Sequence, residues 1–196
     1  MRLFLALEID DAARAAIGDA AVRIARRLSK LGAGGAVKWV GRENLHVTLR
    51  FLGEVADTNV PPLIAALESP LAIGAFEMVL GGGGCFPPGG PPRVIWVAVT
   101  HGAAEARRTY AELERRLSAF DVEREARPYT PHLTLGRVRE IPRSAGASLR
   151  AWASELPSPI AHVRVAAATL FRSRLSPNGA SYERLLQVPL AGGDGR

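Results

Sequence analysis

The sequence predicts an α+β fold in which two pseudo-symmetric lobes line a central cleft with antiparallel sheets and carry their helices outside. Stretches of alternating polar and apolar residues predict strands, and stretches with apolar residues three or four positions apart predict amphipathic helices. The order strand, helix, strand occurs twice, and the last strand of each copy carries the string His-x-Thr-Leu. We therefore expect an internal duplication, with residues 1–196 forming a single domain of two intertwined lobes.

The first half of the chain supplies a strand, a long helix and the first string. Residues 2–9 alternate loosely and predict a strand, after which Asp10 or Asp11 can cap a helix. Residues 44–53 predict the strand that contains the string. The apolar face of the helix comprises Ile17, Ala21, Ile24, Leu28 and Leu31. The remaining elements are short strands at 37–40 and 73–80 and a helix that starts at Pro61 and Pro62 and reaches about Leu67.

Residues 81–92 read Gly-Gly-Gly-Gly-Cys-Phe-Pro-Pro-Gly-Gly-Pro-Pro, a composition that argues against a helix or an inner strand. A glycine run can cradle phosphate, but no Lys-Ser or Lys-Thr pair follows this one, and it opens no helix. A P-loop is therefore not expected. We expect a surface loop near the middle of the chain.

The second half repeats the first in outline. Residues 93–100 predict a strand, and residues 129–138 predict the strand that contains the second string. Between them, a helix is indicated by apolar spacing at Ala106, Tyr110, Leu113 and Leu117. The chain then continues with a helix near 144–155, strands near 160–172 and 181–190, and a turn between them at Pro177-Asn178-Gly179.

The two strings supply the candidate catalytic residues, His46 with Thr48 and His132 with Thr134. Residues i and i+2 of a strand share a face, so each string places an imidazole beside a hydroxyl. Two such pairs across a cleft would place two proton-transfer groups and two hydrogen-bond donors around one anionic group. That combination can cleave a phosphodiester by acid–base catalysis.

One such string alone would indicate only a structural feature. Threonine is a good strand residue, and a histidine on a half-buried strand face is usually structural or exposed. Two matching strings in a chain with 4 histidines favour the catalytic interpretation. The other two histidines, His101 and His162, lack the threonine, and we expect them to be structural or exposed.

Two arginines near the strings are candidates for binding substrate. Arg50 lies at i+4 from His46 and shares its face if the strand is regular. Its position fits a solvent-exposed arginine at a strand end equally well. Arg137 lies at i+5 from His132 and reaches that face only if a bulge at Gly136 shifts the register.

Two tyrosines are candidates for stacking on a nucleobase, Tyr129 and Tyr182. The alternative for each is a core tyrosine whose hydroxyl reaches water.

The charge of the chain suits a polyanionic partner. The formal net charge is +6, and of the 25 basic residues all but Lys30 and Lys38 are arginine. The planar guanidinium donates two parallel hydrogen bonds to phosphate, and a basic surface attracts RNA. A biased genomic composition would produce the same excess of arginine.

Several classes of site and location are disfavoured. Cys85 is the one cysteine, which excludes an internal disulfide and a thiolate metal cluster. Each string supplies one histidine with no carboxylate beside it, so we expect neither a metal site nor a cofactor. No Gly-x-Ser-x-Gly elbow supports a serine triad.

The N-terminal apolar run is too short for a signal peptide, and no window approaches a membrane span, so we expect a soluble, cytoplasmic protein.

The paired strings resemble the signature of the 2H phosphoesterase superfamily. Over nearly its whole length, to about residue 190, the chain is similar to the bacterial and archaeal RNA 2′,3′-cyclic phosphodiesterase family, whose members were formerly termed 2′-5′ RNA ligases. The segments that carry this resemblance are residues 1–8, Trp39-Val40, 43–53, 92–96, 131–135 and 170–173.

The resemblance implies a two-lobed fold and metal-independent hydrolysis of a terminal 2′,3′-cyclic phosphate on RNA to a 2′-phosphomonoester. It implies that His46 is the general acid toward the 3′ oxygen and that His132 is the general base for water. Contacts to the phosphate are implied for Thr48, Thr134 and Arg137. The family often has phenylalanine where this chain has Tyr129, and stacking should survive that change. An RNA end is the implied partner, with no membrane or protein partner, and we expect a monomer.

Two other functions use the same residues. Reversible 2′-5′ RNA ligation would employ the same groups by microscopic reversibility. A non-catalytic module that binds RNA ends is the other, although a pure binder has no need of two titrating histidines. The acid and base roles can also be exchanged without changing a residue.

Overall fold

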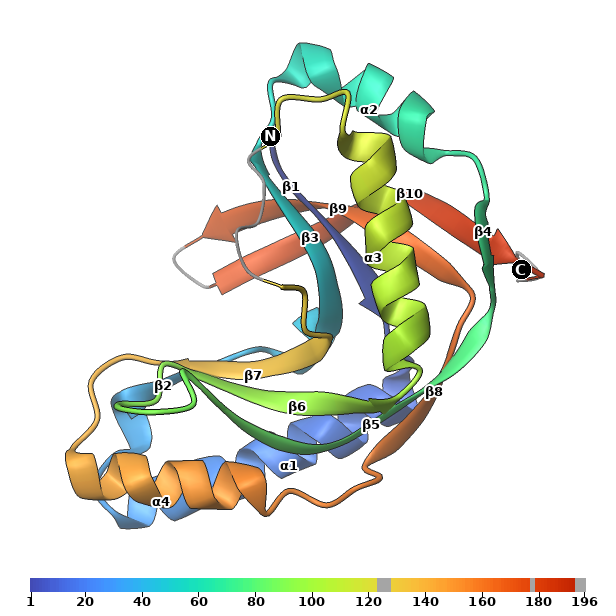
Figure 1. The fold of residues 1–196 in the computed structure, drawn as a ribbon. Helices are drawn as coiled ribbons and strands as arrows, with labels where there is room; N and C mark the ends of the chain where they lie inside the picture. Colours follow the sequence, from blue (N-terminus) through green and yellow to red (C-terminus); the bar gives the residue numbers. More distant parts are fainter. Residues whose placement is uncertain (123–127, 177–178, 193–196) are drawn as a thin grey trace.

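The computed structural model describes residues 1–122, 128–176 and 179–192 as a mixed α+β fold of two lobes (Figure 1). The strands are β1 Arg2–Glu8, β2 Val37–Trp39, β3 His46–Glu54, β4 Leu71–Gly74, β5 Phe76–Phe86, β6 Val94–His101, β7 His132–Val138, β8 Ala161–Val165, β9 Ala167–Ser176 and β10 Gly179–Ala191. The helices are α1 Asp11–Lys30, α2 Val60–Leu67, α3 Ala103–Leu117 and α4 Arg143–Ser154. The predicted fold class is confirmed.

One ten-stranded sheet runs through both lobes in the order β4-β10-β9-β1-β3-β7-β6-β5-β8, and β2 pairs with β7 off this path. Among the described residues, every pairing is antiparallel except that of β10 with β4. The order is nearly symmetric about the junction of β3 and β7. Moving outward from it, β1, β9 and β10 on one side correspond to β6, β5 and β8 on the other. This arrangement agrees with the predicted duplication.

The helices pack across the two halves of the chain. Helix α1 belongs to the first half but packs against β8 and α4 of the second (Figure 1). Helix α3 belongs to the second half but packs against β3, α2 and β4 of the first. Each lobe is therefore completed by a helix from the other half.

Helix α1 begins and ends as local chemistry dictates. The Asp10 carboxylate accepts a hydrogen bond from the Ala13 amide at 2.8 Å and caps the helix. Asp11 in the first turn and Lys30 in the last complement the helix dipole. Of the predicted apolar face, Ile17, Ile24 and Leu28 are buried and Ala21 is half-buried, whereas Leu31 lies beyond the helix and is exposed.

The structure corrects the prediction of a surface loop at residues 81–92. Residues 81–86 form the second half of β5, where the strand pairs with β6, and only the segment that follows is a loop. Glycine is required there because a Cβ on Gly84 would lie 2.7 Å from the Trp96 ring, and one on Gly83 would lie 2.5 Å from the Trp96 carbonyl oxygen. Gly82 has a φ of 60° where the β5–β6 register shifts. The atoms that require these glycines belong to neighbouring elements, which composition does not reveal. The composition of residues 81–92 therefore predicted a loop.

Some predicted strand limits were also wrong. The strand expected near 160–172 is two strands, β8 and β9, that meet at Ala166. The second string opens β7 at His132, so Tyr129 precedes the strand rather than starting it. Of the predicted turn, Pro177 and Asn178 lie outside the described residues.

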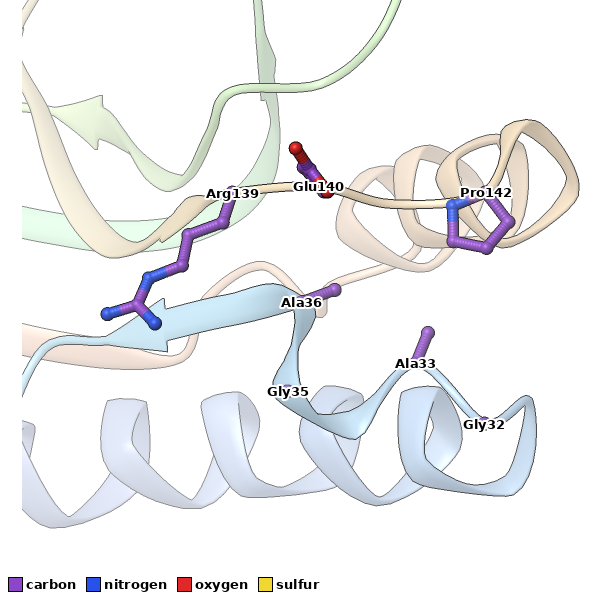
Figure 2. A pocket seen from close by; sticks show the side chains of 7 residues that line it. All are labelled: Gly32, Ala33, Gly35, Ala36, Arg139, Glu140 and Pro142. Atoms are coloured by element: carbon purple, nitrogen blue, oxygen red, sulfur yellow. The ribbon is translucent and has the colours of Figure 1, made fainter.

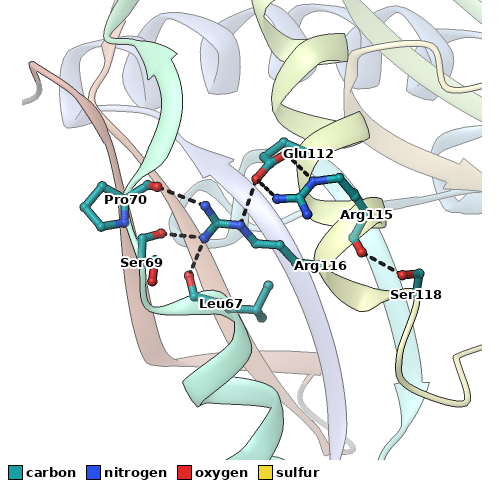
Figure 3. Close-up of polar contacts among 7 residues, drawn as sticks. All are labelled: Leu67, Ser69, Pro70, Glu112, Arg115, Arg116 and Ser118. Atoms are coloured by element: carbon teal, nitrogen blue, oxygen red, sulfur yellow. Dashed lines mark hydrogen bonds and ion pairs between the residues drawn. The ribbon is translucent and has the colours of Figure 1, made fainter.

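A polar network fixes the C-terminal end of α3 to the connection between α2 and β4 (Figure 3). The Arg116 guanidinium donates to the carbonyl oxygens of Leu67, Ser69 and Pro70, and its Nε donates to Glu112 at 3.0 Å. The arginines beside Glu112 lower its pKa to about 2, with the Arg115 hydrogen bond as the main cause. The network therefore joins α3 to the connection between α2 and β4.

None of the helices in the described residues combines the length and apolar character that crossing a membrane requires.

The packing of β5 on Trp96 makes a stability prediction. Replacing Gly84 with alanine should lower the free energy of unfolding by about 1–3 kcal/mol, because the new methyl group overlaps the indole ring. The control is Gly89→Ala in the exposed loop, where a Cβ meets nothing within 4 Å, and it should change stability by no more than about 0.5 kcal/mol. Urea unfolding measures both. Equal stability of the two variants would contradict this account of the glycine strand.

Candidate functional site

The two strings meet at the junction of the lobes. Strands β3 and β7 pair at Val47 and Leu133, the residue between the histidine and the threonine of each string. Both side chains are 0% exposed, whereas the flanking histidines and threonines are half-buried. Because neighbouring residues of a strand point to opposite faces, all four functional side chains lie on the face opposite this buried pair. We call it the site face.

Each imidazole is held at its Nδ1 atom by the backbone carbonyl oxygen of the residue two positions earlier. The Nδ1 of His46 lies 2.7 Å from the Asn44 carbonyl oxygen, and the Nδ1 of His132 lies 2.7 Å from the Thr130 carbonyl oxygen. A carbonyl only accepts, so each Nδ1 carries a proton and each Nε2 is the nitrogen left to exchange one. The Nε2 of His46 also lies 3.0 Å from the Thr48 hydroxyl oxygen.

Aromatic rings surround both histidines. Phe4 and Tyr182 lie 5.0 and 5.5 Å from the His46 ring centroid, and Phe86 and Trp96 lie 5.1 and 6.4 Å from that of His132. Burial lowers the pKa of both histidines below the usual 6.5 because it disfavours the charged ring. The carbonyl bonds at Nδ1 oppose the shift, and Arg137 adds to it at His132.

Each string ends in a bulge, because the register skips its last residue, Leu49 in β3 and Leu135 in β7. The register shifts between Leu5 and Ala6 opposite the first string, and between Ile95 and Trp96 opposite the second. Beyond the bulge, the residue at i+5 from the histidine returns to the site face. In β7 this residue is Arg137, and its charge acts on both His132 and Tyr182. The expected bulge is present, but its extra residue is Leu135 and not the predicted Gly136.

The same bulge corrects the prediction for Arg50. It turns Arg50 away from the site face, where its side chain is 7% exposed and pairs with Glu114 of α3 at 2.5 Å. Phe51 takes the place on the site face, 51% exposed and 6.0 Å from Phe4 between ring centroids. The regular alternation assumed for Arg50 did not hold, because a bulge changes the parity of every later residue.

The Tyr129 side chain packs against α3 and reaches the backbone of β3. Its ring stacks on Tyr110 of α3, with centroids 4.5 Å apart at 14°. Its hydroxyl donates a hydrogen bond to the Thr48 carbonyl oxygen at 3.0 Å. Burial raises the pKa of this hydroxyl well above its usual value, so it remains a donor. One face of the ring is therefore already covered, and the stacking of Tyr129 on a base stays a prediction.

Sequence reasoning named Tyr182 but missed other residues around it on the site face. Phe4 and Phe171 stack with centroids 5.2 Å apart, and Tyr182 meets Phe4 edge-on at 4.8 Å. Beside them, Arg184 binds both carboxylate oxygens of Glu8. The alternation of β1 contained a signal for Phe4 and Glu8, which lie on the face shared with Ala6. Phe86 gave no signal because its segment read as a loop.

The remaining histidines lie outside the site. His101 is exposed at the end of β6, and His162 is exposed on β8 with its Nδ1 2.6 Å from Glu77. Within the described residues, no group of three or more His, Cys, Asp or Glu side chains is placed to hold a metal ion. The donor set at the strings is two histidines and two hydroxyls, without a carboxylate that bridges them.

A pocket of about 540 Å³ lies away from the strings, between the end of α1 and the approach to α4 (Figure 2). It is lined mainly by small residues, with Arg139 and Glu140 at its rim. Nothing in its lining resembles the paired strings, and we assign the chemistry to the site face.

The chain matches the LigT-like phosphoesterase family model twice, over residues 13–96 and 97–182. Each match contains one of the two strings, in line with the repeated topology of the sheet. The two matches together span most of the chain.

Curated relatives and solved structures agree with this match. The RNA 2′,3′-cyclic phosphodiesterase of Aeropyrum pernix is 36% identical over 173 residues, covering 86% of this chain and 96% of the relative. That of Archaeoglobus fulgidus is 31% identical over 185 residues, covering 94% and 98%. The crystal structure of TT0787 of Thermus thermophilus has a TM-score of 0.69 and 28% identity, covering 98% and 99%. The crystal structure of E. coli LigT complexed with 3′-AMP has a TM-score of 0.70 and 22% identity, covering 97% of this chain and 98% of that one. This likeness shows the fold alone. The chain belongs to the LigT-like phosphoesterase family.

Proposed function

We propose that the protein hydrolyses the terminal 2′,3′-cyclic phosphate of RNA to a 2′-phosphomonoester by a metal-independent, two-histidine mechanism. The observation that carries the proposal is the pairing of Val47 with Leu133, which sets both His-x-Thr pairs on one face. Family membership and the names of the relatives support the substrate class.

In the proposed reaction, water attacks the phosphorus while the bond to the 3′ oxygen breaks. The Nε2 of His132 takes a proton from the water, and the protonated Nε2 of His46 gives one to the leaving 3′ oxygen. The product keeps its phosphate on the 2′ oxygen, and the two histidines exchange their protonation states. Because both Nδ1 atoms are bonded to carbonyls, the proton is exchanged at Nε2 in both rings.

The threonines and Arg137 stabilise the charge that develops on the phosphoryl oxygens. Thr48 is coupled to His46, because its hydroxyl can donate to the Nε2 only while that ring is neutral. Once His46 is protonated, the Nε2 donates and the Thr48 hydrogen is free to turn to a phosphate oxygen. Thr134 supplies the matching hydroxyl, and Arg137 reaches the same face across the bulge.

Both strings come from one chain, so the site needs no residue from a second copy. We therefore also propose that the protein acts as a monomer, in the cytoplasm, on RNA ends. Light scattering of the purified protein tests the oligomeric state.

The central test removes one proton-transfer group at a time. His46→Asn and His132→Asn should each lower kcat for a 2′,3′-cyclic phosphate oligonucleotide by about 10²–10⁴-fold. The fold-loss of kcat in the double variant should be far smaller than the product of the two single losses, because the histidines act as a unit. His162→Asn on β8 is the control and should keep full activity. Unchanged activity of both site variants would refute the mechanism, and loss of wild-type activity in EDTA would refute metal independence.

The pH dependence follows from the lowered pKa of each histidine. Both limbs of the kcat/KM profile, which reports the free enzyme, should lie below pH 6.5, with the optimum between them. Above this range the general acid loses its proton, and below it the general base gains one. Removing the ring that buries His132, by Phe86→Ala, should move the profile toward higher pH. A wild-type profile centred above pH 7 would contradict the assigned burial effect.

Arg137 should act on the reaction and not on the fold. Arg137→Ala should lower kcat/KM by about 10–10³-fold through loss of a charge that binds the phosphate, with little change in stability. Arg164→Ala removes an exposed arginine from β8 and serves as the matched control. Equal kinetics of the two variants would remove Arg137 from the site.

A further inference from the structure

We propose that Tyr129 is a positioning residue, whose hydroxyl holds Thr48 in place relative to His132 and so couples the two strings. The inference rests on the proposed function for the catalytic roles of Thr48 and His132. It goes beyond that function because Tyr129 touches neither the reacting atoms nor the site face.

The segment that precedes β7 holds both strings at once. The Tyr129 hydroxyl donates to the Thr48 carbonyl oxygen at 3.0 Å, and the carbonyl of the next residue, Thr130, orients His132 through its Nδ1 at 2.7 Å. Pro131 lies between Thr130 and His132 and fixes the backbone there. A shift of this segment would therefore move the His132 imidazole and the Thr48 backbone together.

Helix α3 supports this segment from behind. Tyr110 stacks on the Tyr129 ring, and Glu114, one helical turn further on, pairs with Arg50, two residues after Thr48. The face of one helix thus contacts both the segment before the second string and the strand after the first. These contacts leave the Tyr129 hydroxyl directed at Thr48.

A second tie is needed because the direct junction is narrow. Strands β3 and β7 share the single paired position Val47–Leu133, and the strands diverge from it. The duplication does not demand this tie, since the equivalent position before the first string is Glu43, which accepts a hydrogen bond from Asn44. The link through Tyr129 is therefore specific to the second string.

The first test removes the hydroxyl alone. Tyr129→Phe keeps the stack on Tyr110 and should lower kcat by about 3- to 30-fold with KM nearly unchanged, because substrate still binds but Thr48 is misplaced. The control is Thr109→Val, which removes another buried hydroxyl whose bond to the Glu105 carbonyl stays within α3. It should lower stability to a similar extent and leave kcat unchanged. Wild-type kcat in Tyr129→Phe would overturn the proposal.

A double-mutant cycle tests whether Tyr129 acts through Thr48. In a Thr48→Val background, Tyr129→Phe should cause no further loss of kcat, since the hydroxyl that it positions is gone. Additive losses would show a separate role and overturn the proposal.

A spectroscopic readout separates this inference from the proposed function. The ring resonances of His46, whose Nε2 lies 3.0 Å from the Thr48 hydroxyl, should titrate at a different pH in Tyr129→Phe but not in Thr109→Val. This NMR titration needs no substrate. If the wild-type protein leaves the cyclic phosphate intact, the proposed function is refuted. A shifted His46 titration in Tyr129→Phe would still support the positioning role. An unchanged His46 titration in Tyr129→Phe would refute the positioning role, whether or not the enzyme is active.

Discussion

The antiparallel pairing of Val47 with Leu133 is the contact on which the rest of the site depends. It joins the two lobes through the residue between the histidine and the threonine of each string, and both side chains are fully buried. Since strand residues alternate between faces, burying this pair turns two histidines and two threonines to the opposite side. One backbone register thus assembles four groups that come from two distant parts of the sequence.

In the proposed reaction, burial of the rings would prepare the histidines for an anionic substrate. Aromatic neighbours exclude water from both imidazoles and lower the pKa of each. A phosphate that enters would favour the charged ring, so substrate binding itself would help to protonate the general acid. The hydrogen bond between Thr48 and His46 adds a local coupling, because the hydroxyl becomes free to donate when the ring gains its proton.

Irregular backbone accounts for much of what distinguishes the two sides of the site. The same bulge ends both strings, yet it brings Phe51 to the site face in one strand and Arg137 in the other. One side of the site therefore presents an aromatic ring and the other a cation. Glycines in β5 serve a related purpose, since they leave room for Trp96 beside His132.

The sequence by itself determined the α+β class, the duplication, the capped helix α1 and the two strings, because these follow from periodicity and local hydrogen bonding. It also indicated that Arg137 needs a bulge to reach the site face, although the predicted position, Gly136, was one residue too late. Only the tertiary structure decided the fate of Arg50 and Tyr129, which turn to Glu114 and Thr48, and the identity of residues 81–86 as part of a strand. The physical reason is that bulges and close approaches between strands depend on partners distant in the chain, which local spacing and composition do not encode.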